Sequence, residues 1–297
     1  MTILLDKTQR HLSSRAQNDL ANHRLFDILY ADDTLICGTR PETVEEYAAA
    51  LGRAGLEFGL CLHWGKTQAI SVCSEQILRS SQGQNITDTG CMIYLGGLIT
   101  ADGHTDSELS RRIGSAAGEF KALRSFWSHA NVSRKRKLQL FHSLVVSKLQ
   151  YGLSTVWLVT AHRRRLDGFY ARCLRRVLGI PSAYVSRISN KTVLQRAEVL
   201  AFSDQVLRRQ LLLLGKVAFS PAGSPLRKDV FVGDSLRPQI GRYVRRVGRP
   251  RRDWLTEVWK SGAQLLGGDG RLRALLQSQE QHPEVAWRCE VNKAFQR

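Results

Sequence analysis

The sequence predicts an α+β protein, because strand-like and helix-like patterns occupy different parts of the chain. Between Leu25 and Cys37, two apolar runs flank the adjacent carboxylates of Asp32 and Asp33, a pattern typical of a buried β-hairpin with an acidic turn. From Thr105 onward, apolar residues recur at helical spacing. With 297 residues, of which 43% are hydrophobic, the chain can form one large domain or two ordinary ones.

The acidic pair of the hairpin is a candidate metal site. Between buried strands, the mutual repulsion of Asp32 and Asp33 is costly unless a cation offsets it. Mg²⁺ suits this place, because it prefers oxygen ligands and is commonly held by one or two carboxylates together with substrate phosphates. An ordinary surface hairpin with an acidic tip is the alternative interpretation.

The first hundred residues contain the remaining strand-like segments. Thr2–Leu5 is expected to be a short strand, and the polar stretch that follows is compatible with a helix. A further helix should begin near Pro41 with Thr39 as its cap, and it should end before Gly59. Two more strand-like segments are expected, at 69–73 and at 93–99 with a bend at Gly96–Gly97.

The rest of the chain is expected to be mainly helical. A capping box at Thr105–Glu108 predicts the start of the first helix, and Ser133 precedes the second. The third helix should begin near Ala161 and end at Gly179. Residues 220–238 are rich in Pro and Gly, which predicts a loop. The other expected helices are one capped by Asn190, one over Phe202–Phe219 and short ones over 253–297.

The formal charge of +18 is unevenly distributed. Residues 1–110 contain 8 Lys and Arg against 14 Asp and Glu, whereas residues 111–297 contain 36 against 12. Such an excess of cations in one part of a chain favours a polyanionic partner, most simply nucleic acid.

The cysteines and the apolar runs indicate a soluble, intracellular protein of the nucleus or cytoplasm. The six Cys are scattered, without a Cys-x-x-Cys pair or a His at zinc-ligand spacing, which predicts reduced thiols. The first residues turn polar too soon for a signal peptide. No apolar run approaches the ~18–20 residues that a membrane span needs, so no membrane partner is expected.

Three motifs resemble those of reverse transcriptases, in particular of non-LTR (LINE-like) retrotransposons. Tyr30-Ala31-Asp32-Asp33 between apolar strands resembles the catalytic hairpin of these enzymes. The segment 59–67 resembles the family pattern Gly-Leu-x-(Leu/Ile)-Asn-x-x-Lys-Thr, with His63 where the family has Asn, and Tyr94-Leu95-Gly96 resembles the primer-grip segment. Three motifs in the right order are far more specific than any one of them.

The resemblance covers Leu25 to about Ile180 and implies an RNA-directed DNA polymerase. In such nucleotidyl transfer a primer 3′-hydroxyl attacks the α-phosphate of a deoxynucleoside triphosphate on an RNA template, and two Mg²⁺ ions ~3.5–4 Å apart assist. The implied metal ligands are Asp32 and, more weakly, Asp33. Lys66 would lie near the triphosphate as a catalytic proton donor. The residues implied to contact the primer and template are Tyr30, Tyr94, Leu95, Gly96, Arg134, Lys135, Arg136 and Lys137.

The implied architecture is a partial polymerase palm (an antiparallel hairpin plus a helix), a mainly α-helical thumb and a basic helical C-terminal region. Its expected segments are the palm over 1–104, the thumb over 105–160, a basic helical region over 161–219, an Arg-rich linker over 220–252 and short helices over 253–297. Only 29 residues precede Tyr30, so the family's first catalytic Asp and its nucleotide-pocket motif cannot both be present at normal spacing. Asp6 and Asp27 are poor substitutes, and we therefore expect a truncated, catalytically impaired chain.

Arginine-rich stretches are the candidate contacts to a nucleic-acid backbone. Arg134 to Lys137 open a helix at the end where its dipole disfavours cations, which favours a phosphate partner. Gly248-Arg249-Pro250 resembles the core of an AT-hook, but Val247 replaces the usual Arg, so a general phosphate-binding stretch is the preferred interpretation. The candidate backbone contacts are Arg163, Arg164, Arg165, Arg172, Arg175, Arg176, Arg245, Arg246, Arg249, Arg251 and Arg252.

Two alternatives to a polymerase remain open. A non-catalytic nucleic-acid-binding protein would use the basic part alone, and its binding would depend steeply on salt but not on Asp32 or Mg²⁺. A decayed gene product would fold poorly, because a partial palm leaves strand edges and apolar surface uncovered.

Overall fold

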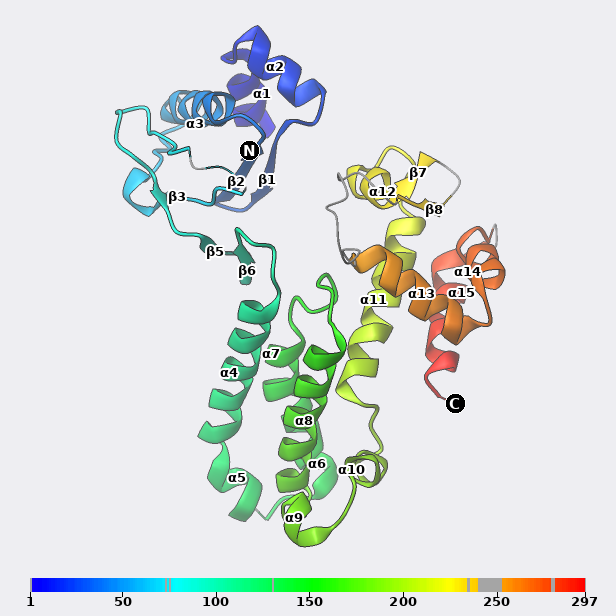
Figure 1. The fold of residues 1–297 in the computed structure, drawn as a ribbon. Helices are drawn as coiled ribbons and strands as arrows, with labels where there is room; N and C mark the ends of the chain where they lie inside the picture. The colour runs from blue at the N-terminus through cyan, green and yellow to red at the C-terminus, as the bar shows by residue number, and fades with distance from the viewer. Residues whose placement is uncertain are drawn as a thin grey trace. The chain divides into compact units, whose positions relative to one another are not determined.

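The computed structural model describes residues 2–72, 74, 76–129, 131–233, 236–239, 253–278 and 281–296. The chain divides into two compact units, Met1–His104 (unit 1) and Thr105–Arg297 (unit 2). The described chain is mostly helical with small two-stranded sheets (Figure 1), which agrees with the α+β class in its coarse form. None of the described helices is both long enough and apolar enough to cross a membrane.

Unit 1 is a set of helices with three two-stranded sheets. The sheets β1–β2 and β5–β6 are antiparallel hairpins, and β3–β4 is a short parallel pair. Its elements are α1 (Thr2–Arg10), α2 (Ser14–Ala21), β1 (Leu25–Tyr30), β2 (Asp33–Gly38), α3 (Pro41–Leu56), the 3-10 helix η1 (Trp64–Lys66), β3 (Gln68–Ala69), β4 (Thr87–Asp88), β5 (Cys91–Tyr94) and β6 (Gly97–Thr100).

The start of the chain differs from its prediction. Thr2–Leu5 belongs to α1 and is not a strand. The reason is tertiary packing, since Leu4 is buried against Leu51 and Ala54 of α3, and only a helix also brings the Thr8 hydroxyl back to the Leu4 carbonyl, 2.8 Å away.

Two further expectations for unit 1 need correction. Thr39 does not cap α3, because its N–H continues the hairpin by donating to the Arg24 carbonyl at 2.9 Å, and Arg40 is the N-cap residue without a side-chain bond. The strand predicted over 69–73 is reduced to the two residues of β3, and Cys73 lies outside the described residues.

The core of unit 1 is small. One cluster joins α2, β1 and α3 through buried residues, and a second joins α1 to α3. Only Leu25 of β1 is buried, whereas Phe26, Ile28 and Tyr30 are all exposed. The prediction that the two strands flanking the acidic pair are buried is therefore wrong.

The described part of unit 2 is an assembly of helices with one short hairpin. Its elements are α4 (Asp106–Ala122), α5 (Arg124–His129), α6 (Arg134–Leu140), the π-helical turn η2 (Phe141–Val146), α7 (Ser147–Gln150), α8 (Thr160–Val177), α9 (Ala183–Ser186), α10 (Asn190–Ala197), α11 (Phe202–Ala218), α12 (Pro225–Val230), β7 (Phe231–Val232), β8 (Arg237–Pro238), α13 (Trp254–Leu266), α14 (Asp269–Leu276) and α15 (Pro283–Ala294).

Most helices of unit 2 lie where their apolar periodicity predicts them, but their caps differ. Ser133 caps α6, as its hydroxyl accepts from the Arg136 N–H at 3.4 Å. Thr105 makes no capping bond to α4, because its hydroxyl instead donates to the Trp157 carbonyl at 3.4 Å. Ser189 rather than its neighbour is the N-cap of α10. The region 220–238, predicted as a loop, contains α12 and the β7–β8 hairpin.

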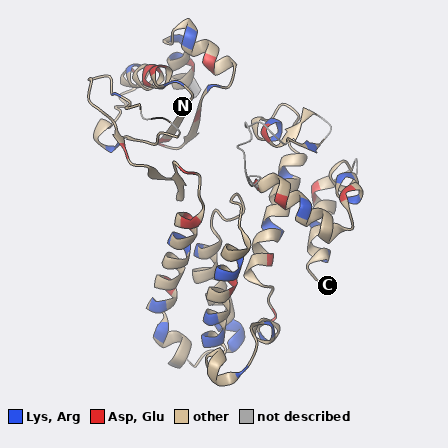
Figure 2. Cartoon of the chain, in the orientation of Figure 1, with Lys and Arg blue, Asp and Glu red and all other residues tan. Residues whose placement is uncertain are grey.

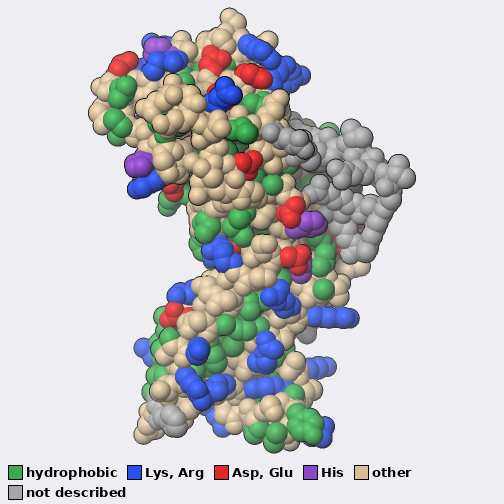
Figure 3. Space-filling model, turned by 60° about the vertical axis from the view of Figure 1, so that its left-hand side comes forward, with side chains coloured by type: hydrophobic (Ala, Val, Ile, Leu, Met, Phe, Trp, Pro, Cys, Tyr) green, Lys and Arg blue, Asp and Glu red, His purple; other side chains and the backbone are tan. Residues whose placement is uncertain are grey.

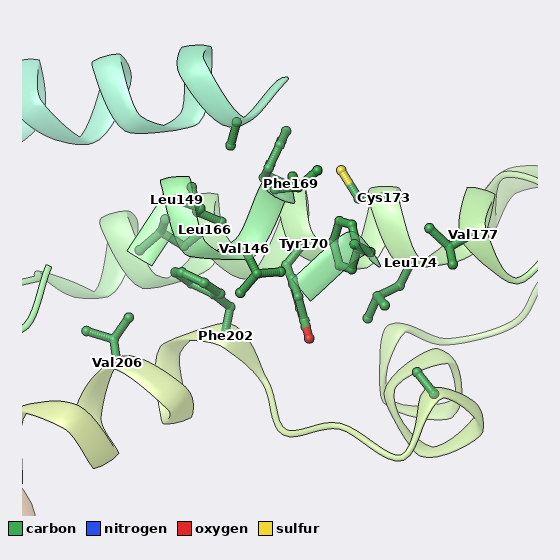
Figure 4. Packing of buried hydrophobic residues seen from close by; sticks show 14 of the residues in the cluster. Val146, Leu149, Leu166, Phe169, Tyr170, Cys173, Leu174, Val177, Phe202 and Val206 are labelled. Atoms are coloured by element: carbon green, nitrogen blue, oxygen red, sulfur yellow. The ribbon is translucent and has the colours of Figure 1, made fainter. Parts of the chain in front are cut away.

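Two large hydrophobic clusters hold unit 2 together. The first centres on α8, whose Leu166, Tyr170 and Leu174 lie between η2–α7 and the start of α11 (Figure 4). The second joins α11 to α13, α14 and α15, where the Trp287 indole N–H donates to the Leu211 carbonyl at 3.0 Å. The helical pattern read from the sequence is thus built around a substantial core.

Candidate functional site

The acidic motif forms the tip of the β1–β2 hairpin. Tyr30 pairs with Asp33, so that Ala31 and Asp32 form a two-residue loop. Ala31 has φ of +54°, a left-handed conformation that costs a non-glycine residue roughly 1 kcal/mol. Both carboxylates are exposed, so solvent rather than protein surrounds the acidic pair.

The Tyr94-Leu95-Gly96 motif forms the tip of the β5–β6 hairpin and meets β1. Leu95 and Gly96 have φ of +47° and +73°, as the tight turn between Tyr94 and Gly97 requires. The Tyr94 hydroxyl donates to the Ile28 carbonyl at 2.8 Å. Partial burial and then the Asp33 carboxylate raise the pKa of Tyr94. The fold therefore brings two of the three motifs together.

The two carboxylates considered as substitute ligands are engaged elsewhere. Asp27 accepts a hydrogen bond of 2.9 Å from the buried hydroxyl of Tyr47, and Asp6 forms an exposed ion pair with Arg10 at 2.7 Å. In the described parts of the chain, no group of three or more His, Cys, Asp or Glu is placed to hold a metal ion. Mg²⁺ is commonly held by one or two carboxylates with waters and substrate phosphates, and the exposed Asp32 and Asp33 are a pair of this kind.

The third motif follows α3 and is not seen to join the other two. Gly59, with φ of +71°, ends the helical turn, and the chain then packs back onto α3. A Cβ at Gly55 would approach the Leu60 carbonyl to 3.0 Å, so glycine permits this close contact. Lys66 ends the exposed turn η1. Among the described residues, Lys66 makes no hydrogen bond or ion pair with Asp32 or Asp33.

The charge of the molecule is concentrated in unit 2. Unit 1 contains 8 Lys and Arg against 12 Asp and Glu, whereas unit 2 contains 36 against 14. Within unit 2, residues 120–197 contain 16 Lys and Arg and a single acid, Asp167. That acid is engaged, because its carboxylate accepts from the N–H and hydroxyl of Ser203, each at 2.8 Å.

The cations of this stretch form an exposed basic surface. Figure 2 shows Lys and Arg along α5, α6 and α8 with few acidic residues, and Figure 3 shows blue side chains spread over this helical part. Arg134, Lys135, Arg164 and Arg172 are exposed. Such a surface attracts phosphates over the distance of a Debye length, about 8 Å at physiological salt.

Several predicted phosphate contacts also have structural partners. Arg165 donates to the Ser110 hydroxyl at 3.1 Å, and Arg176 donates to the Ser128 hydroxyl at 3.5 Å. Arg163 lies over the Trp157 ring. Lys137 donates to the Trp127 carbonyl in α5 at 3.0 Å. Arg136 donates to the side chain of Gln139, on its own helix. These cations remain near the surface but are held by the fold.

Arg175 is a correction to the predicted set. Its guanidinium is buried and donates to the Ser186 hydroxyl at 3.3 Å, the Ile188 carbonyl at 2.6 Å and the Asn190 side chain at 3.0 Å. With these acceptors it positions the segment that follows α8, and we remove it from the candidate phosphate contacts. The predicted contacts Arg245, Arg246, Arg249, Arg251 and Arg252, and the AT-hook-like segment, lie outside the described residues.

Sequence reasoning missed part of the basic surface. Lys121, Arg124, Arg187 and Arg196 are exposed members of the same stretch. The signal that could have identified them is the absence of any acid between Glu119 and Asp167, which is more informative than the local Arg clusters.

Comparison with known proteins identifies a distant relative of this chain. The chain is 27% identical over 161 residues to a transposon-derived protein of Caenorhabditis elegans, an alignment that covers 52% of this chain and 57% of that protein. The chain is distantly similar to a transposon-derived protein. It spans little more than half the length of this relative. No protein-family model matches the chain, and no solved structure does.

Proposed function

We propose that this chain is a reverse-transcriptase-type protein of a transposable element, and that it binds nucleic acid mainly through the basic surface of unit 2. The observation that carries the proposal is the hydrogen bond from Tyr94 to Ile28. It brings the turn that resembles a primer grip against the strand that precedes the acidic motif, although the two are 66 residues apart in sequence. The similarity to a transposon-derived protein supports the same origin.

The acidic hairpin would be the metal-binding part of this protein. Asp32 and Asp33 would hold Mg²⁺, which when bound supplies the charge that stabilises a reacting phosphate. The Tyr94 hydroxyl anchors the β5–β6 turn to β1 through its hydrogen bond to Ile28. The exposed Tyr30, next to the acidic loop, would border the primer end. Lys66 would act as a proton donor only if η1 approached the hairpin.

The basic surface of unit 2 would bind the RNA template and DNA primer through their phosphates. With 16 cations and one engaged acid in residues 120–197, attraction to a polyanion is not offset locally. Each neutralised phosphate of a duplex contributes roughly −0.9 to the slope of log K against log salt concentration. Binding should therefore weaken steeply as salt is raised.

A non-catalytic nucleic-acid-binding protein is the second candidate. It is favoured by one observation, namely that the described residues supply the acidic pair with no third carboxylate. The two candidates share the basic surface and differ only in what the hairpin does.

Primer extension on an RNA template with Mg²⁺ and deoxynucleoside triphosphates distinguishes them. The polymerase proposal predicts weak extension that disappears in Asp32→Asn, while Asp6→Asn, an exposed carboxylate of the same unit, extends as the original chain does. Salt-dependent binding without extension would support the non-catalytic candidate. Absence of both binding and extension would contradict the proposal.

A further inference from the structure

A pocket of about 500 Å³ lies at the C-terminal end of α8. Its walls are apolar, formed by Leu178, Ile180, Pro181 and Ile188, and two arginines from other helices, Arg134 of α6 and Arg196 of α10, also line it. Figure 1 shows α9 and α10 close to this end of α8. A pocket of this volume lies in the range that binds small molecules and single nucleotides.

The pocket is built by the backbone that terminates α8. The Ile180 N–H donates to the Arg175 carbonyl at 2.8 Å and the Gly179 N–H to the Arg176 carbonyl at 3.2 Å, with Gly179 at φ of +69°. This pair of backbone hydrogen bonds is a common way to end a helix. The buried Arg175 guanidinium donates to the carbonyl of Ile188, another lining residue, at 2.6 Å. Hydrogen bonds made by the backbone thus hold Gly179, Ile180 and Ile188 in place.

The polar groups of the pocket are cationic and available. Arg134 and Arg196 are exposed, and neither guanidinium has a hydrogen-bond or ion-pair partner among the described residues. The only acid in the surrounding stretch 120–197, Asp167, is engaged by Ser203. An apolar pocket with two uncommitted guanidinium groups matches a ligand that has a flat, weakly polar part and a phosphate.

An aromatic side chain stands beside the pocket. The short helix α9 connects Pro181 to Ile188, the two ends of the pocket wall, and its Tyr184 is 79% exposed. The Arg187 guanidinium lies 5.1 Å from the centre of the Tyr184 ring. Exposed aromatic rings next to arginines are the surfaces on which proteins stack unpaired bases.

We propose that this pocket binds one unpaired nucleotide of a nucleic-acid strand. The base enters between the apolar walls, Arg134 and Arg196 hold the phosphates on either side, and Tyr184 stacks on the neighbouring base. This inference rests on the proposed binding of nucleic acid by unit 2, and it adds that unit 2 distinguishes unpaired from paired nucleotides.

The test uses the full chain and two fluorescent probes, a blunt RNA–DNA duplex and the same duplex with a single-stranded overhang. Stacking of a base on an aromatic side chain strengthens binding, so we expect the overhang to improve affinity about tenfold in fluorescence anisotropy titrations. Ile188→Phe fills the pocket without changing charge. It should abolish the preference while leaving affinity for the blunt duplex within about twofold.

A charge variant and its matched control complete the test. Arg134→Gln with Arg196→Gln should also remove the preference for the overhang. Arg164→Gln with Arg172→Gln, which removes the same charge from an exposed face of α8, should weaken both probes equally. If Ile188→Phe lowers the melting temperature substantially, the exposed Arg134 and Arg196 pair decides the question.

The outcomes separate the inference from the proposed function. If no probe binds, nucleic-acid binding by unit 2 is wrong. If both probes bind equally, or if the pocket variants keep the preference, the pocket assignment is wrong. Adenosine monophosphate tests the other source of the same chemistry, and if it binds the pocket more tightly than the overhang does, the site serves free nucleotides and the strand proposal is overturned.

Discussion

The two units of the chain differ in how function relates to packing. In unit 1 the acidic hairpin rests on small clusters, and most apolar side chains of β1 face solvent. Unit 2 contains two large cores, and the helices that carry the basic surface enclose the first of them. Because burial of apolar area is the main source of stability, the basic surface should persist under conditions that unfold the hairpin. The acidic hairpin of unit 1 and the basic surface of unit 2 should therefore be lost at different denaturant concentrations.

The largest expected effect comes from emptying the core of unit 2. Phe141 is fully buried and its ring contacts those of Phe120, Trp127 and Tyr170. Phe141→Ala should lower the free energy of unfolding of unit 2 by about 3–5 kcal/mol. Hydrogen exchange followed by mass spectrometry would show the loss of protection in unit 2 and unchanged protection in unit 1.

Leu144→Ala is the matched control for this variant. Leu144 lies on the same π-helical turn but is 38% exposed, so its truncation should cost no more than about 1 kcal/mol. Equal losses from the two variants, or loss of protection in unit 1 as well, would show that the division into a weak and a strong unit is wrong.

The second-largest loss of stability is expected from replacing Arg175. Its removal leaves the Ile188 carbonyl and the Asn190 side chain without their donor, and Arg175→Met should cost about 2–4 kcal/mol in a urea titration. Arg176→Met removes the same charge from an exposed neighbour and should leave stability within about 0.5 kcal/mol. If Arg176→Met were the more destabilising change, the assignment of a structural role to Arg175 would fail.

These two arginines show what sequence could and could not supply. Helical periodicity located α8, and the Gly-Ile-Pro string located its end. The string of arginines could not show which one is buried, because this depends on acceptors in the segment 186–190 that the fold brings back to α8. Local pattern therefore located the element, and tertiary contacts decided the role of each cation.

The same limit applies to unit 1. Local sequence predicts turns at Asp32–Asp33 and Gly96–Gly97, and the structure has both turns one residue earlier, at Ala31–Asp32 and Leu95–Gly96. Long-range packing determines three other features of this unit. These are the hydrogen bond from Tyr94 to β1, the hydrogen bond from Tyr47 to Asp27 and the helical conformation of Thr2–Leu5. Propensity alone does not contain that information.

In unit 1, loss of the hydrogen bond between Tyr47 and Asp27 should have a moderate effect on stability. Tyr47 is fully buried, its hydroxyl donates to Asp27 at 2.9 Å, and burial together with that carboxylate raises its pKa. Tyr47→Phe should lower the stability of unit 1 by about 1 kcal/mol in a urea titration. Tyr30→Phe on the same hairpin, where the ring is 64% exposed, should change it by less than about 0.5 kcal/mol. A larger loss from Tyr30→Phe would indicate that the hairpin tip, and not its base, is the stabilised part.

The smallest expected effect is a difference in pH dependence between the units. Burial lowers the pKa of His142 in unit 2, where Tyr170 is its neighbour at 3.3 Å and burial raises the pKa of that phenol to about 12. A histidine whose folded pKa is lowered contributes full stability above its unfolded pKa of about 6.5 and loses it as pH falls through the folded pKa. Urea midpoints between pH 7 and pH 5 should therefore fall more for unit 2 of the original chain than for His142→Gln. Parallel pH profiles for His142→Gln and the original chain would contradict the burial of this titratable group.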